Sequence, residues 1–142
     1  MNPAREKYYK GVFLVAAVYD ILLGIIFTFF HDAAFRTLGI PEKLPEFRGY
    51  LALLGAFLFV IGCAYWLICL GDLRRNRDLI TVGALYKLAY SAIAFYYFAV
   101  GNVPHLIFVA VFGAADLVFF VMMAECRLFL RRDEAGAEPH SS

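Results

Sequence analysis

Residues 49–70 read GYLALLGAFLFVIGCAYWLICL and contain no charged side chain. An α-helix needs about 20 consecutive apolar residues to cross the hydrocarbon core of a bilayer. The whole chain is 63% hydrophobic, whereas a soluble domain has roughly 45–50% apolar residues. This stretch therefore predicts a membrane-spanning helix in a membrane protein.

Three more stretches reach the same length, at about residues 11–30, 79–100 and 105–125. The first follows basic residues, as a signal sequence does, but its apolar core is longer than the roughly 7–15 residues typical of one. We therefore expect it to be retained as a span. The predicted fold is all-α, an integral membrane four-helix bundle over residues 1–132, followed by a polar, disordered tail over residues 133–142.

The basic residues outside the spans are divided unevenly between the two sides of the membrane. One side has nine: Arg5, Lys7, Lys10, Arg74, Arg75, Arg77, Arg127, Arg131 and Arg132. The other side has three: Arg36, Lys43 and Arg48. Because basic residues are retained on the cytoplasmic side, both termini are predicted to be cytoplasmic.

The external loop over residues 31–48 mixes apolar residues with charges, which predicts a lid or short helix at the outer interface.

Three charged residues, Asp20, Lys87 and Asp116, lie near the middle of three different spans. A charge at the bilayer centre costs at least ~2.5–3.5 kcal/mol, so such residues usually face a partner or a wet cavity. All three lie ~12–15 Å from the cytoplasmic ends of their spans, at 1.5 Å per residue. Small or hydroxyl residues lie one turn away and permit close helix approach: Ala16, Gly24, Gly83 and Ser91. We predict one buried polar site.

The purpose of that site has two interpretations. Lys87 can neutralise only one of the two aspartates, so the other is left unpaired or shares a proton. A buried ion pair can equally serve to fix helix register. Four residues are candidates to extend the polar network, Tyr19, Tyr86, Tyr90 and Ser91, and four are candidates for a polar outer vestibule, His31, Arg48, Asn102 and His105. The alternative for the vestibule residues is an ordinary place at helix ends.

Several functional classes lack their sequence signals. The three cysteines form no C-x-x-C pair, and there is no phosphate-binding loop, H-x-x-x-H pair or hydrolase motif. We therefore predict no metal site and no cofactor. We also predict no nucleic-acid partner, because the basic residues flank spans instead of forming a patch. The abundant aromatic residues pack the core or line a cavity for a flat lipophile such as a quinone or a sterol.

The sequence also carries a family resemblance. Arg48-Gly49 opens the second span, the run LLGAFLFVIGCAYW follows, Arg-Asn-Arg precedes Gly83-Ala-Leu-Tyr-Lys87, and Asp116-Leu117 lies in the fourth span. Over about residues 11–130 this pattern resembles the DoxX-like or BphX-like small four-helix bacterial membrane proteins. The resemblance implies a multi-pass protein of the bacterial inner membrane. It also implies a link, found in a few relatives, to quinone-coupled or oxidative-stress complexes.

Three functional classes follow. We favour a non-catalytic membrane subunit or a binder of a lipophilic small ligand, with a membrane protein or a second copy of the chain as partner. The alternatives are a quinone-linked membrane redox partner and a proton-coupled carrier subunit. A membrane isomerase of the emopamil-binding type is a more distant alternative. It is considered because such isomerases also use acidic residues inside the membrane.

Overall fold

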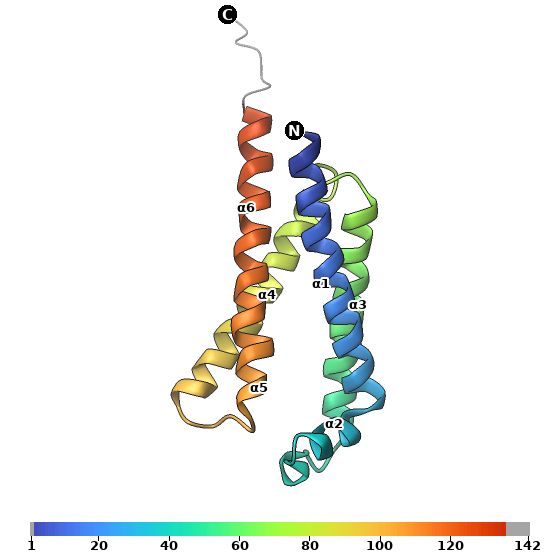
Figure 1. The fold of residues 1–142 in the computed structure, drawn as a ribbon, viewed down its shortest axis with the longest axis vertical. Coiled ribbons are helices and arrows are strands. Elements are labelled where there is room, and N and C mark those ends of the chain that lie inside the picture. The colour runs from blue at the N-terminus through green and yellow to red at the C-terminus, as the bar shows by residue number, and fades with distance from the viewer. Residues whose placement is uncertain (1, 136–142) are drawn as a thin grey trace, which may run out of the picture.

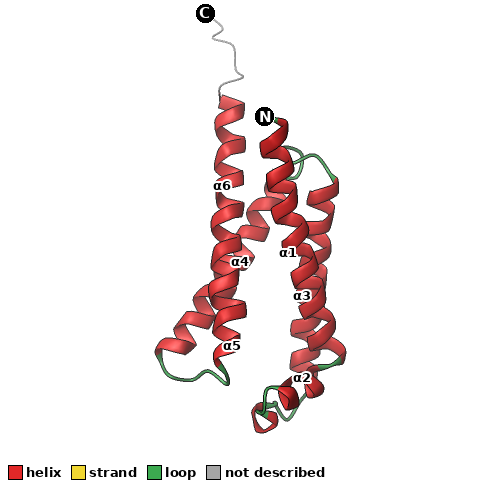
Figure 2. Ribbon diagram, in the orientation of Figure 1, coloured by secondary structure: helices red, strands yellow, loops and turns green. Residues whose placement is uncertain are grey.

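The computed structural model describes residues 2–135, and within them it contains helices and no strand (Figure 2). A short helix forms in the loop where one was predicted, and the long helices follow the apolar stretches. The elements in chain order are α1 (Pro3–Phe29), α2 (His31–Thr37), η1 (Pro41–Lys43), α3 (Gly49–Leu70), α4 (Arg77–Ala99), α5 (Leu106–Phe108), η2 (Val109–Ala115) and α6 (Asp116–Ala135).

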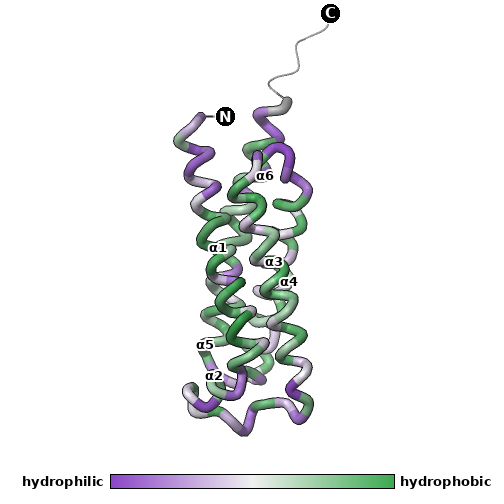
Figure 3. Tube along the Cα trace, turned by 90° about the vertical axis from the view of Figure 1, so that its right-hand side faces the viewer, coloured by the Kyte–Doolittle hydropathy of each residue, from purple (hydrophilic) through white to green (hydrophobic). Residues whose placement is uncertain are grey.

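Within residues 2–135, four helical stretches are long and apolar enough to cross a membrane: α1, α3, α4 and the continuous stretch Leu106–Asp133. Large apolar side chains lie on their outward faces, including Leu22, Phe57 and Val118, each more than half exposed. An apolar surface of this extent is typical of a protein that contacts lipid. Figure 3 shows the same distribution, with hydrophilic ends and a hydrophobic middle.

The long helices form two pairs, since the most extensive contacts join α1 to α3 and α4 to η2 and α6. The start of α1 and the end of α6 lie at one end of the molecule, together with the α3–α4 turn (Figure 1). We call this the terminal end. The opposite end carries α2 and the turn before α5, and we call it the α2 end.

Close backbone contact between α1 and α3 depends on glycine. A Cβ atom on Gly55 would lie 2.5 Å from the backbone nitrogen of Thr28, and one on Gly24 would lie 2.7 Å from that of Phe59. Real Cβ contacts are longer than this, so any larger residue would push the helices apart. Gly24 belongs to the small-residue stripe expected to permit such an approach.

Two apolar clusters divide the interior along its length. The cluster at the terminal end is densely packed, and includes Phe13, Tyr65, Ile68, Ile80, Met123 and Leu130, all fully buried. The cluster at the α2 end has only Phe27, Phe35 and Leu58 buried, with partly exposed aromatic residues around them. The predicted charged residues lie between the two clusters.

The α3–α4 turn is a short, charged connection, as the sequence indicates. The Oδ1 atom of Asp72 accepts a hydrogen bond from the backbone N–H of Arg75 at 3.0 Å. This bond stabilises the ionised carboxylate and lowers the pKa of Asp72 below its usual value. The side chain of Asn76 donates to the Asp72 carbonyl oxygen at 2.9 Å and completes the turn.

The C-terminal boundary differs from the prediction. α6 continues to Ala135, so residues 133–135 are helical and do not belong to a tail. Asp133, within this extension of the helix, pairs with Arg74 of the α3–α4 turn. The rest of the predicted tail, residues 136–142, lies outside the described residues.

Candidate functional site

The three charged residues meet in one buried ion triad. The Nζ atom of Lys87 donates hydrogen bonds to Asp20 Oδ1 at 2.7 Å and to Asp116 Oδ1 at 2.8 Å. All three residues have no solvent exposure. Because Asp20 belongs to α1, Lys87 to α4 and Asp116 to α6, the triad joins the two helix pairs.

Aromatic rings surround the ammonium group of Lys87. Its Nζ lies 4.9 Å from the ring centre of Tyr19, 5.4 Å from that of Phe119 and 5.8 Å from that of Tyr65. At these distances the ring quadrupoles attract a cation, more strongly where water is excluded. The lysine is thus held by two carboxylates and three aromatic rings.

Each carboxylate of the triad has one oxygen without a protein partner. Asp20 Oδ2 and Asp116 Oδ2 are buried and accept no hydrogen bond within the described part of the chain. Burial of a polar atom without a partner is costly, and more so for an ionised group. Two carboxylates facing one ammonium group also leave one formal negative charge uncompensated.

Tyrosine hydroxyl groups add three polar contacts between the helix pairs. Tyr19 donates to the carbonyl oxygen of Val111 at 2.7 Å, and Tyr65 donates to that of Gly83 at 2.8 Å. Nearer the terminal end, Tyr9 donates to Glu125 at 3.2 Å. The pairs are therefore joined by polar groups as well as by the apolar cluster at the terminal end, whereas α1 and α3 are joined by close glycine contacts.

A π-helical segment, η2, directly precedes Asp116. Its wider turn changes the hydrogen-bond register of the backbone, and such segments are frequent at functional sites. Hydroxyl groups from outside the segment bond to two of its carbonyl oxygens: Tyr19 to Val111, and Ser91 to Gly113 at 3.0 Å. Tyr19 and Ser91, both predicted members of the polar network, thus hold the segment that sets the position of Asp116.

Removal of these two hydroxyl groups is expected to weaken the π-helical segment. In Tyr19→Phe and in Ser91→Ala, the free energy of unfolding should fall by about 0.5–1.5 kcal/mol, the usual contribution of one hydrogen bond. Titration with SDS in mixed micelles, followed by far-UV circular dichroism, measures the change. Tyr96→Phe is the matched control, because Tyr96 is 63% exposed. Losses no larger than in the control would show that the hydroxyl bonds do not stabilise the segment.

Tyr86 and Tyr90, the other predicted network members, lie one turn apart along α4. Their ring centres are 4.6 Å apart, and the Tyr90 ring lies 5.8 Å from that of Phe112. These contacts are aromatic, and the two rings extend from the triad toward the α2 end.

The four predicted vestibule residues do not all contact one another. Arg48 lies 3.0 Å from Asp32, and His31 lies 3.8 Å from the same carboxylate. His105 instead accepts a hydrogen bond from the backbone N–H of Ile107 and caps α5. Asn102 lies in the turn before α5, in the wall of a cavity. The structure therefore pairs Arg48 with Asp32, places His31 Nδ1 3.1 Å from the carbonyl oxygen of Phe27, and gives His105 a local role at a helix end.

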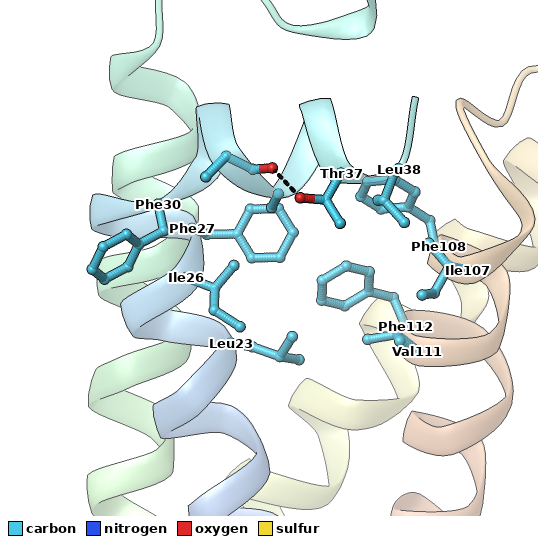
Figure 4. Close-up of a pocket in the computed structure, with 12 residues that line it drawn as sticks. Leu23, Ile26, Phe27, Phe30, Thr37, Leu38, Ile107, Phe108, Val111 and Phe112 are labelled. Atoms are coloured by element: carbon cyan, nitrogen blue, oxygen red, sulfur yellow. Dashed lines mark hydrogen bonds between the residues drawn. The ribbon is translucent and has the colours of Figure 1, made fainter. Parts of the chain in front are cut away.

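Two apolar cavities lie at the α2 end, on either side of a wall formed by Phe27, Phe108 and Phe112. The first has a volume of about 410 Å³ and lies between α1, α2 and the α5–η2 stretch (Figure 4). Its other lining residues are Leu23, Ile26, Phe30, Ala33, Ala34, Thr37, Leu38, Ile107 and Val111. The second, of about 530 Å³, is lined further by Leu51, Leu54, Tyr90, Ile93, Ala94, Tyr97, Asn102, Val103 and Pro104.

The cavities begin one helical turn from the triad on all three of its helices. Leu23 follows Asp20 by three positions, Tyr90 follows Lys87 by three, and Phe112 precedes Asp116 by four. Each step is about one turn of helix. The nearest wall residues of each cavity are therefore about one turn from a charged residue of the triad.

Three residues that contact the triad or join the helix pairs were not among the predicted site residues. Tyr65 and Phe119 contact the lysine, and Tyr9 bonds across the pair interface. Phe119 lies one turn after Asp116, and this spacing in the sequence places it on the same helix face as the charged residue. Tyr65 lies one turn after Gly62, on the glycine face of α3, which is the corresponding signal for that residue.

Together, the fold and the triad define a class: a helical protein with four membrane-length helices and a buried Asp–Lys–Asp site. The chain belongs to the family described as "Family of unknown function (DUF6336)", which it matches over residues 9–125. This match includes the whole triad. No curated protein and no solved structure matches the chain significantly. Nothing in these comparisons links it to DoxX-like or BphX-like proteins, so that resemblance stays a prediction.

Proposed function

We propose that the protein is a non-catalytic binder of a lipophilic small molecule, built as a four-helix bundle in the bacterial inner membrane. The observation that carries this proposal is the pair of apolar cavities around Phe27, Phe108 and Phe112. Cavities of about 300–1,000 Å³ with apolar and aromatic walls are typical of small-molecule sites. Both volumes fall within this range.

The walls of the cavities support a lipophile over a polar substrate. Within the described residues, neither wall contains a charged side chain, and the polar contributions come from Thr37, Tyr90, Tyr97 and Asn102. Flat rings would pack well against Phe27 and Phe112, whose ring centres are 5.7 Å apart. A quinone has such a ring and is a candidate ligand.

The distribution of basic residues supports cytoplasmic termini. The start of α1, the end of α6 and the α3–α4 turn share one end of the molecule (Figure 1). The nine basic residues of the richer group are in these segments and at the start of α4. Under the positive-inside rule this end faces the cytoplasm. The cavities would then open near the outer surface, with α2 beside the first of them.

Mass spectrometry of the purified protein tests the proposal. We expect protein purified in mild detergent to retain a lipophile that organic solvent extracts. The double variant Ala34→Phe/Ala94→Phe places one ring in each cavity and should reduce the retained amount by about tenfold, the equivalent of 1.4 kcal/mol. Val60→Phe is the control, because Val60 is 66% exposed on α3 and lines neither cavity.

The outcomes separate the competing functions. A lipophile lost from the double variant but kept by Val60→Phe supports the proposal, and a quinone among the extracted molecules favours the redox alternative. A wild-type protein without a bound lipophile, or equal retention in the two variants, would contradict ligand binding in the cavities.

A further inference from the structure

The ion triad has a charge imbalance that its own neighbours do not correct. Two fully buried carboxylates face one ammonium group, and each carboxylate retains one buried oxygen, Oδ2, without a protein partner. An unbalanced charge away from water is far more costly than a neutral polar group. A fully ionised Asp20–Lys87–Asp116 site is therefore unfavourable.

We propose that the triad is a proton-binding site, which holds one exchangeable proton between Asp20 and Asp116. The proton is bound to Oδ2 of one aspartate and makes the site neutral. The Oδ1 atoms stay bonded to Lys87. Their distances from Nζ, 2.7 and 2.8 Å, are nearly equal, so neither acid is clearly marked as the ionised one. Coupled acids of this kind titrate as a pair.

The titratable groups around the triad do not supply the missing positive charge. On α1 and α3, the hydroxyl groups of Tyr19 and Tyr65 donate to backbone carbonyl oxygens. On α4, Tyr86 and Tyr90 contact each other. On α6, the ring nearest the lysine is Phe119, which does not titrate. Lys87 is thus the cation of the site, and a proton is the simplest second positive charge.

A metal ion fits the site less well than a proton. Calcium takes about 6–8 oxygen ligands, and magnesium needs near-octahedral geometry. The triad offers two free oxygens on two different helices, and the ammonium group already occupies the space between the carboxylates. Within the described residues, no group of three or more His, Cys, Asp or Glu side chains could hold a metal ion.

Infrared spectroscopy of the full-length protein in lipid vesicles tests the proposal. We expect a carbonyl-stretch band of a protonated carboxylic acid at neutral pH, equivalent to one group per chain. The band should shift after transfer to D₂O, because the proton exchanges. Absence of the band, or a band that deuteration leaves unchanged, would overturn the proposal.

Asparagine variants assign the band to the triad. In Asp20→Asn and in Asp116→Asn, the remaining aspartate pairs with Lys87 as a carboxylate, so the band should disappear in both. An amide has nearly the shape of a protonated carboxyl group, so folding should be retained. Asp32→Asn, at an exposed carboxylate, is the control and should keep the band. Persistence of the band in either triad variant would contradict a shared proton.

The variant Lys87→Met gives an independent readout. Without the ammonium group, both aspartates need a proton to become neutral, so the band should double in intensity in the folded protein. An unchanged or weaker band would show that charge balance does not control proton binding. Neither outcome depends on a molecule in the cavities, so failure of this test and failure of the ligand proposal are distinguishable.

Discussion

Replacement of Lys87 by Met is expected to lower the free energy of unfolding at neutral pH by about 3–5 kcal/mol, the range for removing one partner of a buried ion pair. The substitution removes both hydrogen bonds of the triad. The second aspartate must then also take up a proton to become neutral, which at neutral pH costs free energy relative to its ionised state in the unfolded chain. The substitution also removes the contacts with the rings of Tyr19 and Phe119. Titration with SDS in mixed micelles measures the loss.

The loss should depend on pH and on the partner residues. The cost of the second proton falls as the pH approaches the ordinary pKa of an aspartate, so Lys87→Met should be less destabilising in acid than at neutral pH. One added Asp→Asn substitution should restore part of the stability, and the triple variant with Asp20→Asn and Asp116→Asn most of it. Lys10→Met is the control, since Lys10 forms only a partly exposed pair with Glu6. If the added substitutions restored no stability, the three charges would not be energetic partners.

The expected size of this effect follows from the position of the triad between the helix pairs. The α1–α3 pair has extensive apolar and glycine contacts of its own. The contact between the pairs consists of the apolar cluster at the terminal end and, next to it, the triad and the Tyr19 and Tyr65 hydroxyl bonds. Loss of the lysine therefore removes the charged contact that joins one pair to the other in the middle of the molecule.

Several features of this fold can be read from the sequence because they depend on local composition. The apolar run of residues 49–70 coincides with α3, and the other predicted spans differ from the helices by a few residues at most ends. The first span is longer, since α1 begins at Pro3 with Asn2 as its N-cap. The prediction that Asp20, Lys87 and Asp116 form one site rests on their similar depth in the spans. That depth can be calculated from the helix rise per residue.

Lateral position is harder to predict, because helix rise says nothing about which helices are neighbours. For this reason the sequence predicts one vestibule for four residues at one depth, His31, Arg48, Asn102 and His105. In the structure Arg48 pairs with Asp32, whereas the hydrogen bonds of His31 and His105 are local. The π-helical segment η2 was missed for a related reason. Its register is held by hydroxyl groups on α1 and α4, which no local pattern in residues 109–115 encodes.

The second large effect is expected from a single methyl group at the α1–α3 contact. Alanine normally stabilises a helix relative to glycine by about 1 kcal/mol. At Gly55, however, the new Cβ atom would lie 2.5 Å from the backbone nitrogen of Thr28 and 2.7 Å from the carbonyl oxygen of Gly24. Both atoms belong to the backbone of α1, so no side-chain rotation relieves the contact. We expect Gly55→Ala to lower the free energy of unfolding by about 3 kcal/mol, at the upper end of typical overpacking effects.

Gly11→Ala on α1 is the matched control, because a Cβ atom there would meet no heavy atom within 4 Å. This variant should gain stability from helix propensity. Opposite signs for the same substitution would show that backbone contact, and not propensity, determines the effect at Gly55. The displacement should also reach the triad, because Gly24 lies one turn from Asp20 and a shifted α1 would lengthen the Asp20–Lys87 contact. Gly55→Ala combined with Lys87→Met should therefore be less destabilising than the sum of the two single changes, and strict additivity would mean that the α1–α3 contact and the triad are independent.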